Sequence, residues 1–338
     1  MNKKILLAGF KFPHHSDSSG YHHLATYING HYLNADELIF GQAPIDSKIR
    51  QVNFMYFEFI LKLRGNQQDV IHYIYPEQHL LFSTPKNDKT ISIATIHLDE
   101  QWLDKEVKVT KKFLDRRRRT YESLDGIISL SNDQVERLKK IYPNKHIRFI
   151  PHGINKLKSY AEYKRSESLF SITVVGSNYR DKELLFKVME MAQKDYPTWK
   201  FNLVGISKEW KKEASGFSNA IVHPFLTESQ YFEVMQSSDV HLLPVEFATA
   251  NNALLEAHAL GVPSLTSSCA GIVDYSLEST FHFNNEQEAI EQLAHVASMN
   301  DEEYLNLRRC TQIEAEKFHW SEIARQVEEF YEQVKISK

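Results

Sequence analysis

The chain has 338 residues, of which 42% are hydrophobic and 25% are charged, and this composition fits a globular protein of about two domains. Its formal net charge of −4 argues against general binding of nucleic acid. The two cysteines, Cys269 and Cys310, can form neither a disulfide framework nor a zinc motif, so we expect a reducing compartment.

No segment of the sequence predicts export or membrane insertion. The apolar run from Ile5 to Phe10 is too short for the core of a signal peptide. No stretch approaches the roughly 18 apolar residues that a transmembrane helix needs. We therefore expect a cytoplasmic protein.

The first half of the chain alternates short apolar runs with helical segments. Residues 5–10 form a continuous apolar run that predicts a buried parallel strand, and a polar loop then leads through Gly20 to a helical segment at 21–28. Further strands are predicted at residues 69–74, 90–96, 126–130 and 146–150, with a helix at 131–141. This alternation is typical of a doubly wound α/β sheet.

The same pattern starts again after a polar segment at 161–167, which we interpret as a linker. Strands are predicted at residues 170–176, 200–205, 239–244 and 263–266, and helices at 182–194, 252–260, 286–299 and 301–318. A final amphipathic helix is expected at 320–334, with Ile323, Val327, Phe330 and Val334 on one face. Two similar α/β halves and a closing helix therefore follow from the pattern.

The segment 245–263 is the most informative about chemistry. A strand ends at Pro244, a loop of small residues follows, and Asn251 or Asn252 caps the next helix. The positive end of a helix and its free N–H groups suit a diphosphate. Glu256, about one turn inside the helix, could accept two hydroxyls of a ribose.

This segment resembles the donor-binding motif of retaining glycosyltransferases of the GT-B fold, in particular glycosyltransferase family 4. Residues 255–263, Leu-Glu-Ala-His-Ala-Leu-Gly-Val-Pro, match its second half, and the resemblance implies that Glu256 binds the donor ribose. The first Glu of the pattern falls at Ala248, and the nearest carboxylate is Glu246. A subset of similar enzymes shares the Thr-Ala-Asn-Asn-Ala-Leu-Leu-Glu of residues 249–256.

Other matches follow in the expected order. His97 ends a strand of the first half, Gly20 stands where the family has a Gly pair, and Arg180 and Lys182 stand near its basic pair. The loop 267–271 resembles the small-residue loop beside the donor. The resemblance thus implies catalytic roles for His97 and Glu246 and donor contacts from Gly20, Gly176, Arg180, Lys182, Thr249, Asn251, Asn252, Glu256 and Gly271.

The resemblance also implies an architecture and a reaction. We expect an acceptor-binding domain at 1–155, a donor-binding domain at 156–318, and a helix at 319–338 that packs back on the first domain, with the two Rossmann-like domains facing across a cleft. A sugar would move from a UDP- or GDP-linked donor to a saccharide or lipid-linked acceptor, in bacterial surface polysaccharide or glycan assembly. Two cations and a helix N-terminus would replace a metal ion.

Two alternatives remain open at this point. A nucleotide-sugar epimerase of the same fold would turn over without an acceptor. A non-catalytic nucleotide-sugar binding protein is compatible with the absence of Glu at Ala248. A nicotinamide dehydrogenase is disfavoured, because no G-x-G-x-x-G follows the first strand of either half.

One stretch of the first half is strongly basic. Residues 105–119 contain eight basic residues, namely Lys105, Lys108, Lys111, Lys112, Arg116, Arg117, Arg118 and Arg119, and two acidic ones. Such a stretch predicts either a solvated helix face, which we favour slightly, or peripheral contact with the anionic inner face of the cell membrane. The nearby apolar residues 54–57 and 59–61 are expected to belong to the core rather than to a membrane anchor.

Overall fold

The computed structural model describes residues 3–11, 20–38, 41, 48–80, 84, 88–98, 111–157, 163–166 and 168–338. It divides the chain into two compact units. Of the described residues, unit 1 contains those up to Gly153 together with Trp320–Lys338, and unit 2 contains those from Ile154 to His319. The two units are described in turn.

Unit 1 is built on a six-stranded parallel sheet. Its strands are β1 (Ile5–Gly9), β2 (His31–Asn34), β3 (Val70–Tyr73), β4 (Ile91–Ile96), β5 (Gly126–Ser129) and β6 (His146–Phe149), in the order β2-β1-β3-β4-β5-β6. Every residue of β1, β3, β4 and β5 is buried. A parallel sheet covered on both faces needs such continuous apolar strands, and this is the pattern that the sequence carries.

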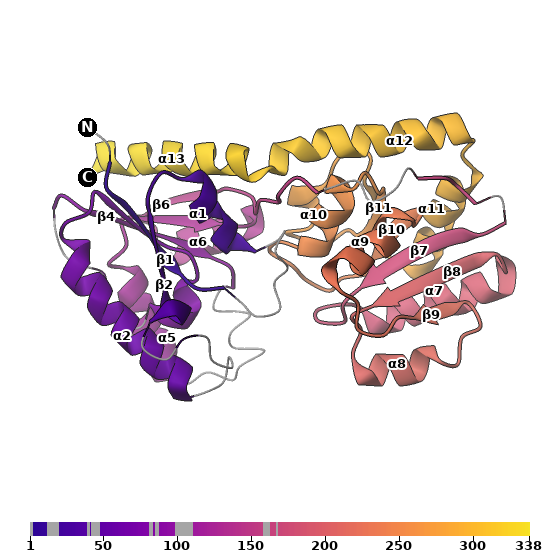
Figure 1. Cartoon of the computed structure of the whole chain (residues 1–338), viewed down its shortest axis with the longest axis horizontal. Coiled ribbons are helices and arrows are strands. Elements are labelled where there is room, and N and C mark those ends of the chain that lie inside the picture. The colour runs from indigo at the N-terminus through magenta and orange to yellow at the C-terminus, as the bar shows by residue number, and fades with distance from the viewer. Residues whose placement is uncertain are drawn as a thin grey trace. The chain divides into compact units, whose positions relative to one another are not determined.

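Helices flank this sheet. They are η1 (Tyr21–His23), α1 (Leu24–Tyr27), η2 (Ala35–Glu37), α2 (Lys48–Gly65), α3 (Pro76–His79), α5 (Lys111–Tyr121), α6 (Asn132–Ile141) and α13 (Trp320–Ser337). The C-terminal helix α13 packs against α1 and β4, as Figure 1 shows. Gly153 permits this close approach at the start of α13, because a Cβ there would lie 2.4 Å from the Trp320 ring. The predicted return of the last helix to the first half is therefore present.

Unit 2 has a second six-stranded parallel sheet. Its strands are β7 (Phe170–Val175), β8 (Trp199–Val204), β9 (Ala220–Val222), β10 (Val240–Leu243), β11 (Ser264–Ser267) and β12 (Phe281–Phe283), in the order β12-β11-β10-β7-β8-β9. Its helices are α7 (Lys182–Asp195), α8 (Lys208–Ala214), α9 (Glu228–Gln236), α10 (Asn252–Ala259), η3 (Val273–Tyr275), α11 (Glu286–Ser298), α12 (Asp301–Glu314) and η4 (Ala315–Phe318). Both units are thus α/β and Rossmann-like.

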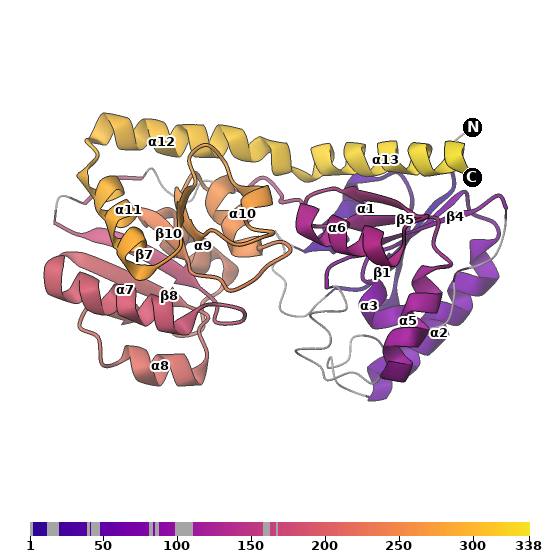
Figure 2. The same ribbon diagram turned by 180° about the vertical axis from the view of Figure 1, so that it is seen from behind.

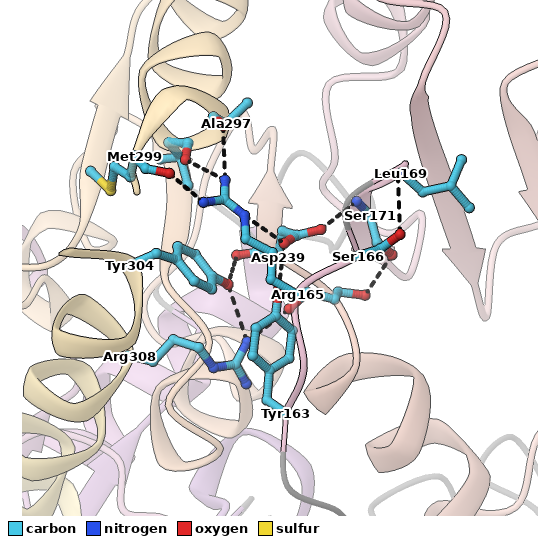
Figure 3. Close-up of polar contacts among 12 residues, drawn as sticks. Tyr163, Arg165, Ser166, Leu169, Ser171, Asp239, Ala297, Met299, Tyr304 and Arg308 are labelled. Atoms are coloured by element: carbon cyan, nitrogen blue, oxygen red, sulfur yellow. Dashed lines mark hydrogen bonds and ion pairs between the residues drawn. The ribbon is translucent and has the colours of Figure 1, made fainter. Parts of the chain in front are cut away.

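A buried polar network closes the amino-terminal edge of the unit 2 sheet (Figure 3). Asp239, just before β10, accepts hydrogen bonds from the Ser171 amide at 2.6 Å and the Tyr163 hydroxyl at 2.5 Å. Arg165 lies 3.7 Å from the same carboxylate and donates to the Val296 and Ala297 carbonyls of α11. The described part of the polar segment 161–167 is therefore tied to the core of unit 2.

All the strands predicted from apolar runs are present, and the three missed ones are short. These are β2, β9 and β12. Every residue of β9 is partly or fully exposed, and β2 and β12 each have a single buried residue. Each of these strands lies at the end of its sheet and pairs with one neighbouring strand, so it needs no continuous apolar run. The helices α2, α3, α8 and α9 were also not predicted.

Candidate functional site

The strand order of unit 2 reverses between β7 and β10, and the loops that leave these two strands meet there. The Asp181 amide donates to the Pro244 carbonyl at 3.0 Å, and the Glu246 amide donates to the Tyr179 carbonyl at 3.2 Å. Arg180 also forms an isolated antiparallel bridge with Val245. Ligands of open α/β sheets bind at the carboxyl ends of the strands at such a reversal, so this is the candidate site of unit 2.

Arg180 is the cation at this point. Its Nε donates to the Val175 carbonyl and its Nη1 to the Asn178 carbonyl, each at 3.2 Å. Burial lowers the pKa of Arg180 to about 10, so the guanidinium remains charged at neutral pH. Over the described ranges of the chain, no carboxylate lies within ion-pair distance of it. A buried cation with only carbonyl partners is suited to an anionic ligand.

Glu256 and Tyr231 form a hydrogen-bonded pair beside Arg180. The Glu256 side chain on α10 is 5% exposed, and its Oε2 accepts a hydrogen bond from the Tyr231 hydroxyl of α9 at 2.6 Å. Burial, followed by the charge of Glu256, raises the pKa of Tyr231 far above its ordinary value, so the phenol stays protonated and donates. The positive charge of Arg180 acts in the opposite direction and lowers the pKa of this phenol. The geometry fixes one carboxylate oxygen and orients the side chain.

Gly271 brings the loop after β11 against the loop after β10. Its φ is +87°, and a Cβ built there would lie 1.8 Å from the Ala248 carbonyl oxygen. Ala248 is itself buried in an apolar cluster with Leu254 and Ile272. Position 248 therefore packs into the core of unit 2, which accounts for a small apolar residue where the family pattern has Glu.

We expect Gly271→Ala to lower the stability of unit 2 by at least about 2 kcal/mol, from left-handed backbone strain and a clash with backbone that cannot move aside. Gly205→Ala is the matched control, because Gly205 also has a positive φ of +65° but no atom within 4 Å of a built Cβ. Chemical denaturation of the two variants separates clash from strain. Equal losses of stability would contradict the close approach of the two loops.

The remaining residues of the segment 245–263 have distinct surroundings. Asn251 caps α10, accepting a hydrogen bond from the Leu254 amide at 3.1 Å, as predicted for an N-cap. Thr249 is 7% exposed, whereas Asn252 is half-buried and Glu246 is exposed. Glu246 thus lies on the surface of the loop, where a ligand could reach it, and its catalytic role stays a prediction.

The loop after β7 holds Gly176 and Lys182 in different situations. Gly176 has a φ of +73° and ends β7. Lys182, at the start of α7, places its ammonium 2.8 Å from Glu209 and 3.1 Å from Glu213 of α8. Lys182 therefore has carboxylate partners that Arg180 lacks, and its contact with a diphosphate stays a prediction. Tyr179, between them, has a φ of +57°, a strained conformation of the kind found at functional sites.

His97 follows β4 at the carboxyl edge of the unit 1 sheet. The backbone amides of His97 and Leu98 both donate to the Oε1 of Glu77, the latter at 3.0 Å. The other carboxylate oxygen of Glu77 lies 3.9 Å from the His97 Nδ1. Burial raises the pKa of Glu77, against the opposing effect of these N–H groups. Glu77 therefore holds the backbone and approaches the ring of His97.

Aromatic rings enclose His97 and tie it to α13. The His97 ring lies 4.5 Å from the ring of Tyr75 and 5.2 Å from that of Tyr21, which it meets edge-on. Tyr21 also meets Trp320 of α13 edge-on at 5.2 Å. Gly20, with a φ of +115°, places Tyr21 at the start of η1. The structure thus brings Gly20 and His97 to one edge of unit 1.

The basic stretch is described from Lys111 onward, and Lys105 and Lys108 lie outside the described residues. In α5, Lys111, Lys112, Arg116, Arg118 and Arg119 are exposed. Arg117 is 5% exposed and donates to the Glu77 carbonyl at 2.8 Å, so its expected membrane contact is wrong. It faces inward because the helix must bury one side against the sheet.

The expectation that residues 54–57 and 59–61 belong to the core is only partly correct. Phe54, Phe57 and Leu61 are buried. Met55 and Phe59 are each 57% exposed, because α2 presents only one of its faces to the sheet.

Sequence reasoning missed Tyr231 and Glu77. A signal for the first was available, because Thr227-Glu228-Ser229-Gln230 is a capping box that predicts the start of α9, and the structure forms both of its hydrogen bonds. For Glu77 the sequence offered only a Pro at the first turn of a short helix. Its role depends on contact with a strand twenty residues later.

Two features are absent from the described part of the chain. No cluster of three or more His, Cys, Asp or Glu side chains there could hold a metal ion. No helix among those residues has the length and apolar character needed to cross a bilayer.

Comparison with known proteins shows a family match over the segment that contains this site. Residues 168–298, which include Arg180, Glu256 and Gly271, match the family model described as glycosyl transferases group 1. Among curated proteins, none matches the sequence.

Solved structures share the fold at low sequence identity. Staphylococcus aureus TarM, solved with UDP, has a TM-score of 0.64 at 12% identity over 82% of this chain and 58% of TarM, so this chain spans little more than half of TarM. Sucrose-phosphate synthase from Thermosynechococcus elongatus has a TM-score of 0.64 at 15% identity, over 99% of this chain and 89% of that one.

An E. coli trehalose-6-phosphate protein bound with UDP-2-fluoro glucose has a TM-score of 0.69 at 11% identity, over 98% of this chain and 99% of that one. Two Rossmann-like units, a last helix that returns to unit 1, and a family match across the site of unit 2 agree with each other. The chain therefore has the GT-B fold, and its residues 168–298 match the glycosyl transferases group 1 model.

Proposed function

We propose that this chain is a retaining glycosyltransferase of the family 4 type, which moves a sugar from a nucleoside-diphosphate donor to a saccharide or lipid-linked saccharide without a metal ion. The observation that carries the proposal is the charged Arg180, free of any carboxylate partner in the described residues, at the strand-order reversal beside the Glu256–Tyr231 pair. This arrangement offers a cation for phosphate and a buried carboxylate for a ribose diol at one edge of one sheet.

The residues would divide the chemistry between them. The bond from the anomeric carbon to the phosphate oxygen breaks, and its electron pair leaves with the nucleoside diphosphate. An acceptor hydroxyl oxygen forms the new bond to the anomeric carbon, and its proton passes to the leaving diphosphate. Arg180 would stabilise the developing charge, together with amides of the first turn of α10 that have no partner within the helix. Glu256 would bind the ribose of the donor. Unit 1 would bind the acceptor and would contribute His97 to the reaction. We propose that the product of the transfer is used in glycan assembly.

The test of the reaction class is release of nucleoside diphosphate from UDP- and GDP-linked sugars, with and without a panel of saccharide acceptors. A transferase releases the diphosphate in an acceptor-dependent manner. Conversion of the donor to its epimer without acceptor would support the epimerase instead. Binding without any turnover would support the binding protein.

Glu256→Gln should weaken binding of the ribonucleoside diphosphate by roughly 10- to 100-fold, because a hydrogen bond to a charged acceptor is worth about 1.5–3 kcal/mol. The same variant should lose the preference for UDP over 2′-deoxy-UDP, since the ribose hydroxyl no longer meets a carboxylate. Calorimetry measures both affinities. Glu233→Gln, on the exposed face of α9, is the control. A preserved preference in Glu256→Gln would remove this residue from the ribose site.

A further inference from the structure

A chain of four buried polar side chains crosses the core of unit 1. It starts at Tyr331 of α13, whose hydroxyl lies 2.8 Å from Nδ1 of His72 on β3. The Nε2 of His72 lies 2.7 Å from the Thr95 hydroxyl of β4, and that hydroxyl donates to the hydroxyl of Tyr21 in η1 at 3.1 Å. All four residues are at most 1% exposed. In both ribbon views α13 lies beside α1, the helix that continues from η1, so the chain joins two segments that also pack together (Figures 1 and 2).

The hydrogen bonds of this chain have one consistent direction. Thr95 donates its only hydroxyl proton to Tyr21, so its oxygen accepts a hydrogen bond from Nε2–H of His72. Burial lowers the pKa of His72 to about 3, so the ring is neutral at physiological pH and carries that one proton. Its Nδ1 must then accept from the Tyr331 hydroxyl. No member can turn without leaving a buried polar group unpaired, and such a network fixes the side chains that it joins.

The Tyr21 end of the chain forms the surroundings of His97. The Tyr21 ring meets the His97 ring edge-on at 5.2 Å. The Tyr21 amide donates to the Tyr75 hydroxyl at 3.0 Å, and the Tyr75 ring lies 4.5 Å from the His97 ring. Glu77 holds the backbone amide of His97 but lies 3.9 Å from the ring Nδ1, which is too far for a hydrogen bond. The orientation of the imidazole, which is 20% exposed, therefore depends on the position of Tyr21.

We propose that Tyr331 and His72 are positioning residues, which keep the His97 ring in the orientation that the transfer reaction needs. They act through Thr95 and Tyr21. This inference rests on the proposed function, from which it takes the role of His97. Apolar side chains of the same shape would fill this part of the core without any polar group to satisfy. A fully satisfied polar chain is therefore better explained by the orientation that it imposes than by the stability that it adds.

Tyr331→Phe removes the first hydroxyl of the chain and keeps the ring. We expect the kcat of transfer to fall about tenfold, because a small misplacement of a reacting group can cost up to about 10²-fold. The KM for the nucleotide sugar should stay within about twofold, since the proposed donor site lies in unit 2. Thr90→Val is the matched control. It removes another buried hydroxyl, which donates to the Gln68 carbonyl at 2.7 Å at the opposite end of β4 from His97, and it should leave kcat unchanged.

A double-mutant cycle separates positioning from damage to the fold. In a His97→Ala background, Tyr331→Phe should change turnover by less than about twofold, because the residue through which it acts is gone. NMR of the histidine ring nitrogens gives a readout that needs no turnover. Tyr331→Phe should shift the His97 signals, and Thr90→Val should leave them in place.

Variants of His72 test the chain itself. His72→Gln retains a donor and an acceptor in its side chain, so kcat should stay within about threefold of wild type. His72→Leu removes both and should lower kcat at least as much as Tyr331→Phe does. Combining His72→Leu with Tyr331→Phe replaces two polar partners by apolar ones, so thermal denaturation should show stability recovered relative to His72→Leu alone, while kcat stays low.

Three results would overturn the proposal. Equal losses of kcat from Tyr331→Phe in the wild-type and His97→Ala backgrounds would show that Tyr331 acts on the fold as a whole. Unchanged His97 ring signals in Tyr331→Phe would show that the chain does not orient His97. A combined His72→Leu and Tyr331→Phe variant that recovers both stability and kcat would reduce the chain to a packing feature. If wild type turns over no nucleotide sugar, the proposed function fails, and the NMR signals still decide whether the chain orients His97.

Discussion

Arg180→Gln should reduce turnover of the nucleotide sugar by about 10²–10³-fold, the usual effect of removing one group that stabilises developing charge. The residue has no carboxylate to lose among its described contacts, which are the Val175 and Asn178 carbonyls, so its charge is available to a ligand. The variant should also lose more affinity for a nucleoside diphosphate than for the free nucleoside. Steady-state kinetics and calorimetry give these two quantities.

Lys182→Gln is the control that the structure supplies. Its ammonium already lies near Glu209 and Glu213, so we expect a smaller loss than for Arg180→Gln. An equal loss would mean that the ion pairs with α8 break when the donor binds. If Arg180→Gln lost affinity for nucleoside and nucleoside diphosphate alike, the guanidinium would not face phosphate, and the proposed function would lose its main support.

Asp239→Ala should lower the stability of unit 2 by about 3–5 kcal/mol, because removing one member of a buried ion pair leaves the other without compensation. Asp239 is 2% exposed, and its carboxylate contacts Ser171, Tyr163 and Arg165. Its loss would free the start of β7 and the segment before it (Figure 3). Urea denaturation gives the stability, and hydrogen exchange in β7 and β10 locates the loss.

Two controls bound that result. Asp195→Ala removes an exposed carboxylate from the end of α7 and should change stability by no more than about 0.5 kcal/mol. Asp239→Asn keeps an acceptor for the Ser171 amide and should fall between the two. A loss below about 1 kcal/mol for Asp239→Ala would show that neighbouring groups satisfy Arg165 and Tyr163 without the carboxylate.

The same residues show how far the sequence by itself determines this protein. The central strands are continuous apolar runs, because both faces of a parallel sheet are covered. The sequence therefore predicts β1, β3, β4, β5, β7 and β10. The N-cap at Asn251, the order of Arg180 before Glu256, and the restart of the strand pattern near residue 170 are local signals too. They suffice to predict two α/β halves and, with the family resemblance, a candidate nucleotide-sugar site in the second.

What the sequence could not determine depends on partners distant in the chain. Edge strands such as β9 need only one neighbour and carry no distinctive run. Arg180 and Lys182 look equivalent in sequence, and only the packing of α8 gives Lys182 two carboxylates. Tyr231 reaches Glu256 from another helix. Arg117 is buried although exposure was expected, and Phe59 is exposed although burial was expected. Tertiary packing, and not residue type alone, decides which side of a helix faces the sheet.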